Sequence, residues 1–278
     1  MLGTNVKGRW IREPSTWRKI SLSTWSRPDN AQIYGLLDVD VGPLQELLAA
    51  RSEESKVKCT ITHAVTRALA MMLRRFPEAN VLVRGRRLWQ RDDVDVFVLV
   101  AMPKGDRAGR ADLSGALIRE ADRKRVEVIA RELADKARAV REEQDVELAK
   151  TRGLLKALPV EVLKVVFDVL GLLQYDLNIG LPGMVRDGFG GVTITSVGML
   201  GVTQAFTPLT TFTRCSALVL VGKVEDKAVV REGLIVARPM CSITGTFDHR
   251  VFDGVLAGRV SDYVRSLLER PELLDGEP

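Results

Sequence analysis

The sequence predicts a layered α/β or α+β domain, and three observations support this. Apolar residues recur at helical spacing in several segments, the run from Val94 to Pro103 is almost continuously apolar as in a buried strand, and strands and helices interleave without a regular βαβ repeat. A chain of 278 residues with 46% hydrophobic residues can bury a large core without disulfide bonds or a structural metal ion. We therefore expect one large globular domain.

The first part of the chain is expected to supply short elements to this core. We expect residues 1–14 to form a polar N-terminal extension that is loosely held, with the domain itself running from 15 to 278. The spacing of apolar residues and the positions of Gly and Pro predict the elements that follow. These are helices at Thr16–Trp25, from Gly42 to about Ala50 and at Ile61–Phe76, a strand at Ala31–Val41, and a hairpin at Val81–Trp89 that turns near Gly85.

The second part continues the irregular order after the buried strand. Its expected elements are a charged loop at Lys104–Arg110, a long charged helix from about Leu117 to Leu148, a helix from Pro159 to about Leu173, strands at Gly191–Val197, Ser216–Val224 and about Val229–Phe247, and a final helix that Asp253 caps and Pro271 ends. The helix that starts at Pro159 lies in an unusually apolar segment, residues 153–185, whose polar residues Glu161, Lys164 and Asp168 share one side.

Charge and residue counts exclude several classes of protein. The 41 Lys and Arg residues exceed the 36 Asp and Glu residues by a net +5, but the two signs are well mixed, so we expect no nucleic-acid binding. Two histidines and three cysteines without CxxC spacing predict neither a metal site nor a disulfide. The sequence lacks a signal peptide and an apolar span, which predicts a cytoplasmic protein with no transmembrane segment.

The segment TGTFDHRVFDG, residues 244–254, brings together several side chains that can take part in catalysis. It combines the imidazole of His249 with the carboxylates of Asp248 and Asp253 and the guanidinium of Arg250. Histidine has the side-chain pKa nearest neutrality, so His249 is a candidate general base. On residue types alone, a structural histidine in a turn is an equally good interpretation.

This segment resembles the DHRxxDG signature of the dihydrolipoyl acyltransferases of 2-oxoacid dehydrogenase complexes, and more distantly the HHxxxDG motif of chloramphenicol acetyltransferase. Further similar motifs extend over roughly residues 15–275, interrupted at 153–185: TWRKI, RRFPEANV, IREADRKRVEVIARELADKARA, VTITSVGMLG and GKVEDKAVVREGLIVARPM. The resemblance implies a chloramphenicol acetyltransferase-like fold, an α+β two-layer sandwich with a mixed sheet, here with an extra helical insert.

The resemblance also implies roles for individual residues. His249 takes the place of the base that removes a proton from a thiol, and Thr195 that of the hydroxyl that stabilises the oxyanion. Ser196 stands where the family usually has Asn. Asp253 is implied to pair with Arg18 and support the site, as Asp248 and Arg250 do. His63 matches no family role, and we expect it to be a structural or surface histidine.

Partners and substrates follow from the same resemblance. It implies a homotrimer with the active site between subunits, coenzyme A entering from one side and dihydrolipoamide from the other. We expect no lipoyl or subunit-binding domain, and hence a stand-alone acyltransferase that uses acyl-coenzyme A and a lipoyl group on a separate carrier protein, or a small-molecule or lipid acceptor. The short acidic ending favours an isolated trimer over a cage.

Two alternatives stay open at this point. The chain could be a non-catalytic oligomeric scaffold that keeps the acyltransferase core. The insert could be an extra helix packed on its own trimer, a lid or wall for a bulky acyl chain, or an interface for a partner or a membrane surface.

Overall fold

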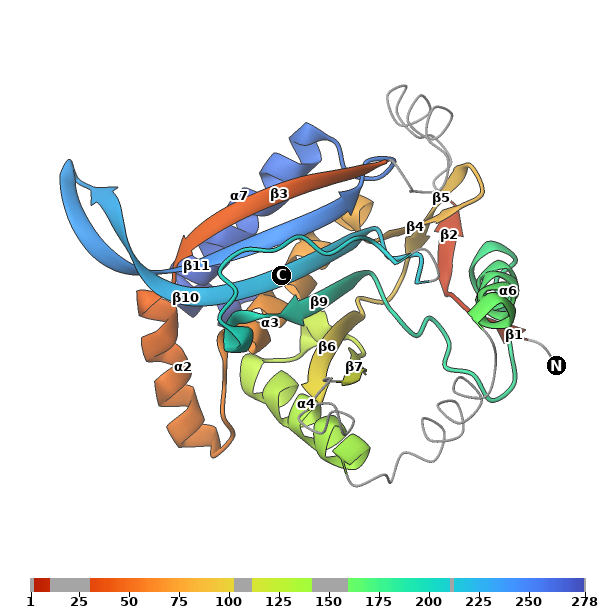
Figure 1. The fold of residues 1–278 in the computed structure, drawn as a ribbon, viewed down its shortest axis with the longest axis horizontal. Helices are drawn as coiled ribbons and strands as arrows, with labels where there is room; N and C mark the ends of the chain where they lie inside the picture. Colours follow the sequence, from red (N-terminus) through yellow and green to blue (C-terminus); the bar gives the residue numbers. More distant parts are fainter. Residues whose placement is uncertain (1–2, 11–30, 103–111, 142–159, 211–212, 278) are drawn as a thin grey trace.

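A six-stranded sheet forms the centre of the protein (Figure 1). The structure is a computed structural model, and it describes residues 3–10, 31–102, 112–141, 160–210 and 213–277. In spatial order the strands are β3 (Gln32–Asp40), β11 (Leu234–Asp248), β10 (Ala217–Arg231), β9 (Val192–Ser196), β6 (Val96–Met102) and β7 (Asp112–Ile118). The sheet is mixed, because β9 runs parallel to both β6 and β10 while the other neighbours are antiparallel.

Four helices cover one face of the sheet, which we call the inner face (Figure 1). They are α2 (Gly42–Ser55), α3 (Ile61–Arg75), α4 (Val126–Arg141) and α7 (Gly254–Glu269). Alternate residues of the strands point into this layer, so Val39, Val219 and Ile243 pack with Ala68 of α3 and Val264 of α7 in one buried cluster. The expected two-layer α+β fold with a mixed sheet is confirmed.

Most predicted elements lie where the sequence patterns put them. The strand that begins near Ala31, the helix that starts at Gly42, the Ile61 helix, the buried strand before Pro103 and the final helix correspond to β3, α2, α3, β6 and α7. The hairpin is also confirmed, with strands β4 (Val81–Arg84) and β5 (Arg87–Arg91) and Gly85 at a positive φ of 58° in its turn. The predicted Thr16–Trp25 helix and Lys104–Arg110 loop lie outside the described residues.

The long helix predicted from Leu117 begins too early. Leu117 and Ile118 end strand β7, which pairs antiparallel with β6, and helix α4 starts only at Val126. Gly115 lets β7 lie under the ring of Phe97, since a Cβ atom at this position would come within 2.0 Å of that ring. The strand is held by its pairing with β6, a long-range contact that the spacing of apolar residues cannot indicate.

The N-terminal extension is ordered over residues 3–10, so the prediction of a loosely held segment is wrong for these residues. Strand β1 (Gly3–Thr4) pairs with β8 (Ile179–Gly180), and β2 (Gly8–Trp10) joins β5 as the edge of a three-stranded sheet with β4. Val6 is 1% exposed and packs with Leu82 and Tyr175 in a second small cluster. The extension is held by tertiary contacts with residues far along the chain.

The predicted helix of the insert corresponds to α6 (Val160–Gly171), which continues into a π-helical turn, Leu172–Asp176. Several apolar side chains of α6 are exposed, among them Val165 and Val169, whereas Tyr175 in the following turn is fully buried. The buried Tyr175 therefore anchors the C-terminal end of the insert to the protein.

Among the helices that the structure describes, none has the length and apolar character of a membrane span.

Candidate active site

The segment from Asp248 to Asp253 forms a tight turn between β11 and α7, at the end of the sheet. The backbone N–H of Asp248 donates to the carbonyl of Ser216, and that of His249 donates to the carbonyl of Ala31 at 2.7 Å. The N–H groups of Val251 and Phe252 both donate back to the carbonyl of Asp248. These bonds fix the position of His249 against the starts of β3 and β10.

The ring of His249 has a defined orientation. Its Nδ1 atom lies 2.7 Å from the carbonyl oxygen of Phe252. A carbonyl oxygen only accepts hydrogen bonds, so Nδ1 must carry the hydrogen. In the neutral ring the lone pair is then on Nε2, the nitrogen that can take up a proton. The carbonyl of Phe252 could not be identified from the sequence, because a backbone group leaves no residue signature.

Asp248 and Arg250 hold the turn through a buried ion pair. Arg250 Nη2 lies 2.6 Å from Asp248 Oδ2, and the backbone N–H of Arg250 donates to Oδ1 of the same carboxylate. The two residues are 3% and 6% exposed. Asp248 is thus paired with Arg250 within the turn, and the role of the two residues in supporting an active site stays a prediction.

Asp253 caps the final helix. Its Oδ1 accepts a hydrogen bond from the backbone N–H of Leu256 at 2.9 Å, which satisfies one of the free donors of the first turn. Arg18, its implied partner, lies outside the described residues, so that ion pair stays a prediction.

Thr195 and Ser196 lie at the carboxyl end of β9, far from His249 of the same chain. Thr195 is in register with Leu220 of β10, which is in register with Thr244 of β11, so His249 lies two strands across and five residues further on. At about 4.8 Å between strands and about 3.3 Å per residue, the two Cα atoms are roughly 19 Å apart. One chain therefore does not bring the candidate base and the candidate oxyanion donor together.

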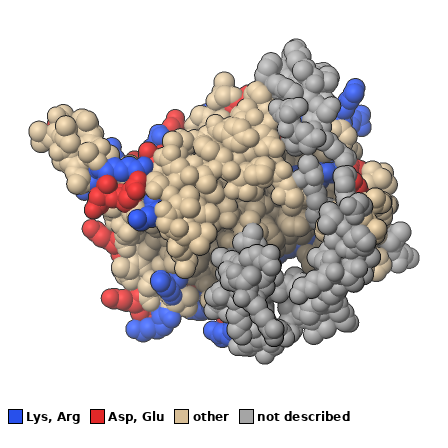
Figure 2. All heavy atoms as spheres, in the orientation of Figure 1, with Lys and Arg blue, Asp and Glu red and all other residues tan. Residues whose placement is uncertain are grey.

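Thr195 belongs to the face of the sheet opposite the helices, the outer face, because Ile194 next to it points into the core. Tyr34 and Leu36 of β3, on the same face, are 60% and 51% exposed, and the ring of Tyr34 packs edge-on against Phe206. Figure 2 shows that this side of the molecule carries few charged residues over the centre of the sheet. The outer face is thus a broad, weakly charged surface.

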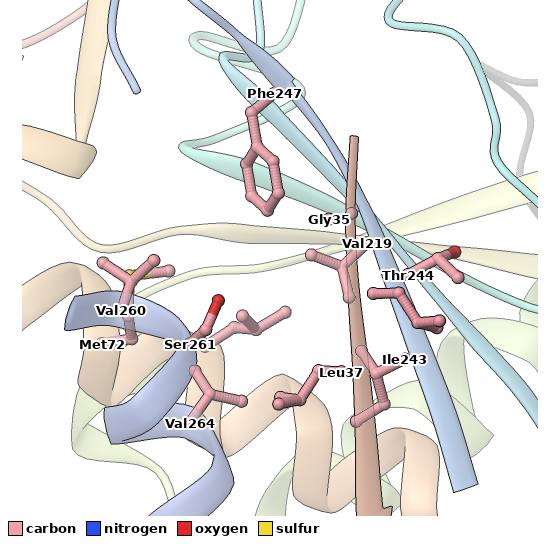
Figure 3. A pocket seen from close by; sticks show the side chains of 13 residues that line it. Gly35, Leu37, Met72, Val219, Ile243, Thr244, Phe247, Val260, Ser261 and Val264 are labelled. Carbon is pink, nitrogen blue, oxygen red and sulfur yellow. The ribbon is translucent and has the colours of Figure 1, made fainter. Parts of the chain in front are cut away.

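A small apolar pocket lies on the inner face behind the turn (Figure 3). It has a volume of about 50 Å³, and two directly paired glycines, Gly35 and Gly245, form part of its wall. Figure 3 shows Leu37 of β3 between Val264 of α7 and Ile243 of β11 in its lining. The ring of Phe247, which also lines the pocket, would be 2.3 Å from a Cβ atom at Gly245. The glycine is required for this ring to lie flat on the sheet.

Of the two interpretations of His63, structural or surface histidine, the structure supports the structural one. Its Nδ1 accepts a hydrogen bond from the backbone N–H of Thr60 in the capping box of α3. Burial lowers the pKa of His63 to about 4, because the charged ring would be poorly solvated there. Among the residues that the structure describes, no group of three or more His, Cys, Asp or Glu could hold a metal ion.

Comparison with protein families gives one match over most of the chain. The family model described as 2-oxoacid dehydrogenases acyltransferase (catalytic domain) matches residues 22–149 and 187–275. The match leaves residues 150–186 outside, which is the region of the insert.

Solved structures of this type share the fold. The cubic core of a pyruvate dehydrogenase multienzyme complex superposes with a TM-score of 0.65 at 21% identity, covering 87% of this chain and 83% of that one. A probable dihydrolipoamide acetyltransferase from Listeria monocytogenes gives 0.64 at 20% identity, covering 95% of each chain. A chloramphenicol acetyltransferase gives 0.51 at 15% identity, covering 94% of this chain and all of that one.

Curated relatives match over a shorter stretch. The dihydrolipoyllysine-residue acetyltransferase component of the pyruvate dehydrogenase complex from Bacillus subtilis is 38% identical over 82 residues, which is 30% of this chain and 18% of that protein. The corresponding component from Staphylococcus aureus is 35% identical over 82 residues, 19% of its length. The aligned stretch is therefore less than a fifth of the length of either relative.

Proposed function

Because the chain belongs to the 2-oxoacid dehydrogenases acyltransferase (catalytic domain) family, we propose that it moves an acyl group between coenzyme A and the thiol of dihydrolipoamide. The observation that carries the proposal is the orientation of the His249 ring. Its Nδ1 donates a hydrogen bond to the Phe252 carbonyl, so Nε2 is the basic nitrogen. A base of this kind is what thiol activation needs, since a free thiol is largely protonated at neutral pH.

The proposed reaction begins with proton transfer. His249 Nε2 takes the proton from the attacking S–H group, and the resulting thiolate forms a bond to the carbonyl carbon of the thioester. The carbonyl π electrons move to oxygen, giving a tetrahedral oxyanion. When this intermediate collapses, the second sulfur leaves with its bonding electrons and receives the proton from His249. The base is regenerated and no oxidant or metal is consumed.

We assign the stabilisation of the oxyanion to Thr195. A hydroxyl that donates to the developing negative charge can lower the barrier by about 3 kcal/mol. The Azotobacter vinelandii dihydrolipoamide acetyltransferase, a structural relative with a TM-score of 0.64, was investigated for the roles of a serine, a histidine and an asparagine in its catalytic mechanism. A hydroxyl and an imidazole are likewise the two groups that we assign here.

The distance between these groups supports a site shared by two chains. At roughly 19 Å between Cα atoms, Thr195 cannot reach a substrate held at His249 of its own chain. We therefore propose a homotrimer in which His249 of one subunit faces Thr195 of the next across the outer face of the sheet. The exposed Tyr34 and Leu36 and the scarcity of charge on that face support burial there.

The test is an acyl-transfer assay on the purified protein. Acetyl-coenzyme A and longer acyl-coenzyme A thioesters are offered with dihydrolipoamide, and with alcohol, amine and other thiol acceptors, and acylated products are measured by mass spectrometry. We expect acyl-dihydrolipoamide, and its loss in His249→Ala but not in the matched variant His63→Gln. Turnover that is unchanged in His249→Ala would overturn the mechanism. A folded trimer that transfers no acyl group would favour the non-catalytic scaffold.

A further inference from the structure

The strands β10 and β11 extend beyond the large sheet as a two-stranded arm, residues 226–239 (Figure 1). The pairing of β11 with β3 ends at Met240 and that of β10 with β9 ends at Val221, so no third strand of the described chain joins the arm. Its turn is tight, because Glu232 and Gly233 have the positive φ angles, 51° and 81°, of a two-residue hairpin loop. A two-stranded hairpin is at best marginally stable by itself in water, so the arm gains from further contacts.

Ion pairs tie the outer face of the arm to the body of the protein. Arg238 Nε lies 2.7 Å from Asp40 Oδ2, and Lys227 Nζ lies 3.3 Å from Asp38 Oδ1. Both carboxylates belong to β3, the edge strand beside the base of the arm. Contacts within the chain therefore set the direction of the arm, and these charges of its outer face are used in them.

The inner face of the arm is apolar and exposed. It continues the side of β11 on which Ile243 is buried, and this alternation places the cross-strand pairs Ala228–Ala237 and Val230–Ile235 on it. All four residues of these pairs are exposed, Val230 by 68% and Ile235 by 79%. Clustered apolar side chains, unlike single ones, mark surfaces that bind other molecules.

A second exposed apolar surface lies on the insert, along helix α6 and the first residue of the turn that follows it. Val162, Val165, Val169 and Leu172 recur at intervals of three and four residues, which places them on one side of the helix. Their exposed fractions lie between 43% and 62%. We call these four residues the α6 stripe. The family match leaves residues 150–186 outside, so the stripe is a feature of this chain and not of the family model.

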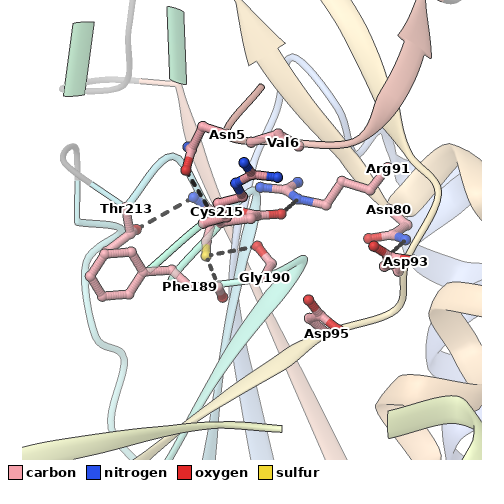
Figure 4. A network of polar contacts seen from close by, with 12 residues as sticks. Asn5, Val6, Asn80, Arg91, Asp93, Asp95, Phe189, Gly190, Thr213 and Cys215 are labelled. Carbon is pink, nitrogen blue, oxygen red and sulfur yellow. Dashed lines mark hydrogen bonds and ion pairs between the residues drawn. The ribbon is translucent and has the colours of Figure 1, made fainter. Parts of the chain in front are cut away.

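Buried contacts hold the end of the insert in place, so the α6 stripe has a fixed direction. The backbone N–H of Asp187 donates to Asn5 Oδ1 at 3.0 Å, and Asp187 Oδ2 accepts from Arg91 Nε at 2.9 Å. Figure 4 shows the side chain of Arg91 extending toward Asn5 at this point. A surface that is ordered before binding loses less conformational entropy when a partner covers it.

The two apolar surfaces lie at opposite ends of the molecule. Figure 1 shows the arm at one end of the long axis and α6 at the other. Along β11, Leu234 in the arm and Asp248 at the far end are 14 positions apart, which is about 46 Å at about 3.3 Å per residue. The surfaces cannot meet within one chain. They can meet between copies that are arranged head to tail, an arrangement that forms a closed ring when the rotation between copies closes.

The proposed shared active site already requires such an arrangement. It places His249, at the end of β11 opposite the arm, against Thr195 of the next copy, which lies at the end of β9 that points toward the arm. We propose that the inner face of the arm docks on the α6 stripe of a second copy of this chain. This inference rests on the homotrimer proposed above and not on the acyl-transfer chemistry. Docking removes both apolar surfaces from water, which stabilises the assembly.

Cross-linking tests the contact directly. The three native cysteines are buried and free, so a cysteine placed on the surface is the one that reacts. In the double variant Ile235→Cys/Val165→Cys, a short bismaleimide is expected to join the chains into covalent trimers, because each chain then presents one cysteine to each neighbour. Neither single variant should form them, and neither should Arg265→Cys/Val165→Cys, in which the first cysteine replaces an exposed residue of α7.

The outcomes of this experiment separate the docking from the proposed function. Trimers that are not cross-linked would overturn the docking alone, and so would cross-linking of Val165→Cys to itself, which would assign the stripe to a contact between two α6 helices. A chain that sediments as a monomer would overturn the docking together with the homotrimer. Covalent trimers that transfer no acyl group would contradict the proposed function and leave the docking intact.

Sedimentation at a series of concentrations measures what the contact contributes to assembly. Val230→Asp/Ile235→Asp is expected to raise the subunit dissociation constant at least about tenfold, since burial of even one such side chain changes affinity by about that factor. Val165→Asp/Val169→Asp should have a similar effect, and all four changes together should have less than the combined effect, because both pairs remove the same contact. Leu234→Asp, on the outer face of the same arm, is the matched control. An arm variant that keeps both its urea midpoint and the original dissociation constant would overturn the proposal, as would independent effects of the two pairs.

Discussion

His249 Nδ1 lies 2.7 Å from the carbonyl oxygen of Phe252, three residues further along the same turn. This bond gives the two nitrogens different roles, because Nδ1 orients the ring and Nε2 is the nitrogen to which we assign the proton transfer. A substitution that keeps the first role and removes the second should therefore be informative.

His249→Asn is such a change, since its side-chain N–H₂ group can donate to Phe252 from nearly the position of Nδ1. We expect the urea midpoint to stay close to that of the unmodified protein, and the rate of acyl transfer to fall by about 10²–10⁴, the contribution of a general base. Steady-state kinetics and urea unfolding measure the two quantities. A rate loss that is matched by an equally large loss of stability would instead mean that His249 only supports the turn.

Mixing two inactive proteins tests the shared site. His249→Ala and Thr195→Ala are each expected to lower the rate, the latter by about 10²–10³. After dissociation and random reassembly in equal amounts, about one quarter of the sites in a cyclic trimer combine an intact His249 with an intact Thr195. The mixture should recover about that fraction of the original rate.

The control for this experiment is Thr195→Ser, which keeps the hydroxyl and should stay active without mixing. Two affinity tags, one on each variant, verify that mixed trimers form. Mixed trimers without recovered activity would refute the intersubunit site.

The ion pair between Asp248 and Arg250 should be needed for stability. Arg250→Met leaves the Asp248 carboxylate buried with its remaining backbone donor, and loss of one partner of a buried pair costs about 3–5 kcal/mol. Urea unfolding measures this loss in the free energy of unfolding. Arg265→Ala, in an exposed pair with Asp262, should change it by less than about 1 kcal/mol. Equal losses of unfolding free energy in the two variants would show that the buried pair contributes no more to stability than the exposed one.

His63 should make stability depend on pH between about 4 and 6.5. Burial lowers its pKa to about 4 in the folded chain, from an ordinary value of 6.5. Below pH 6.5 the unfolded chain binds a proton that the folded chain does not, so its contribution is complete above pH 6.5 and is lost as pH falls toward 4. The loss is about 3 kcal/mol in total.

His63→Gln isolates this effect, because Gln can accept the same cap hydrogen bond and does not titrate. The difference in unfolding free energy between the two proteins should vary across this pH window and be constant above it. A difference that is independent of pH would exclude a titrating His63.

The N-terminal extension should stabilise the end of the insert. Asn5 donates to the carbonyl of Gln174 at 2.9 Å and accepts from the backbone N–H of Asp187 at 3.0 Å, and it is 3% exposed. Asn5→Ala leaves both groups without this partner, so we expect a loss of about 1–3 kcal/mol and faster proteolysis after Tyr175. Lys7→Ala, an exposed side chain, is the control. Equal proteolysis of the two variants would contradict the anchoring role.

The parts of the fold that were predictable are those in which local sequence and burial agree. Helix α3 carries apolar residues at the spacing of one helix face, and α7 begins at a capping Asp253 and buries Val260, Val264 and Leu268. In the candidate site, the turn with His249 could be identified because its side chains form a recognisable motif.

The parts that were not predictable are held by distant atoms. Strand β1 has two residues, and its neighbour Val6 is fixed by Asn178, 172 positions away, through hydrogen bonds to both its N–H and its carbonyl. No local pattern in residues 3–10 reports such contacts. The separation of Thr195 from His249 is of the same kind, since it depends on strand order and register and not on spacing along the chain.

The pairing of β3 with β11 has a consequence for synthesis on the ribosome. Asp40 pairs with Met240 and Gln32 with Asp248, so β3 can meet its partner only about 200 residues later in synthesis. At about 5–20 residues per second, translation of the intervening segment takes roughly 10–40 s. During that time β3 has no strand beside it in the sheet, and Tyr34 and Leu36 remain accessible to chaperones. The pairing of β3 with β11 is therefore a late step, which must wait until residues 240–248 have been synthesised.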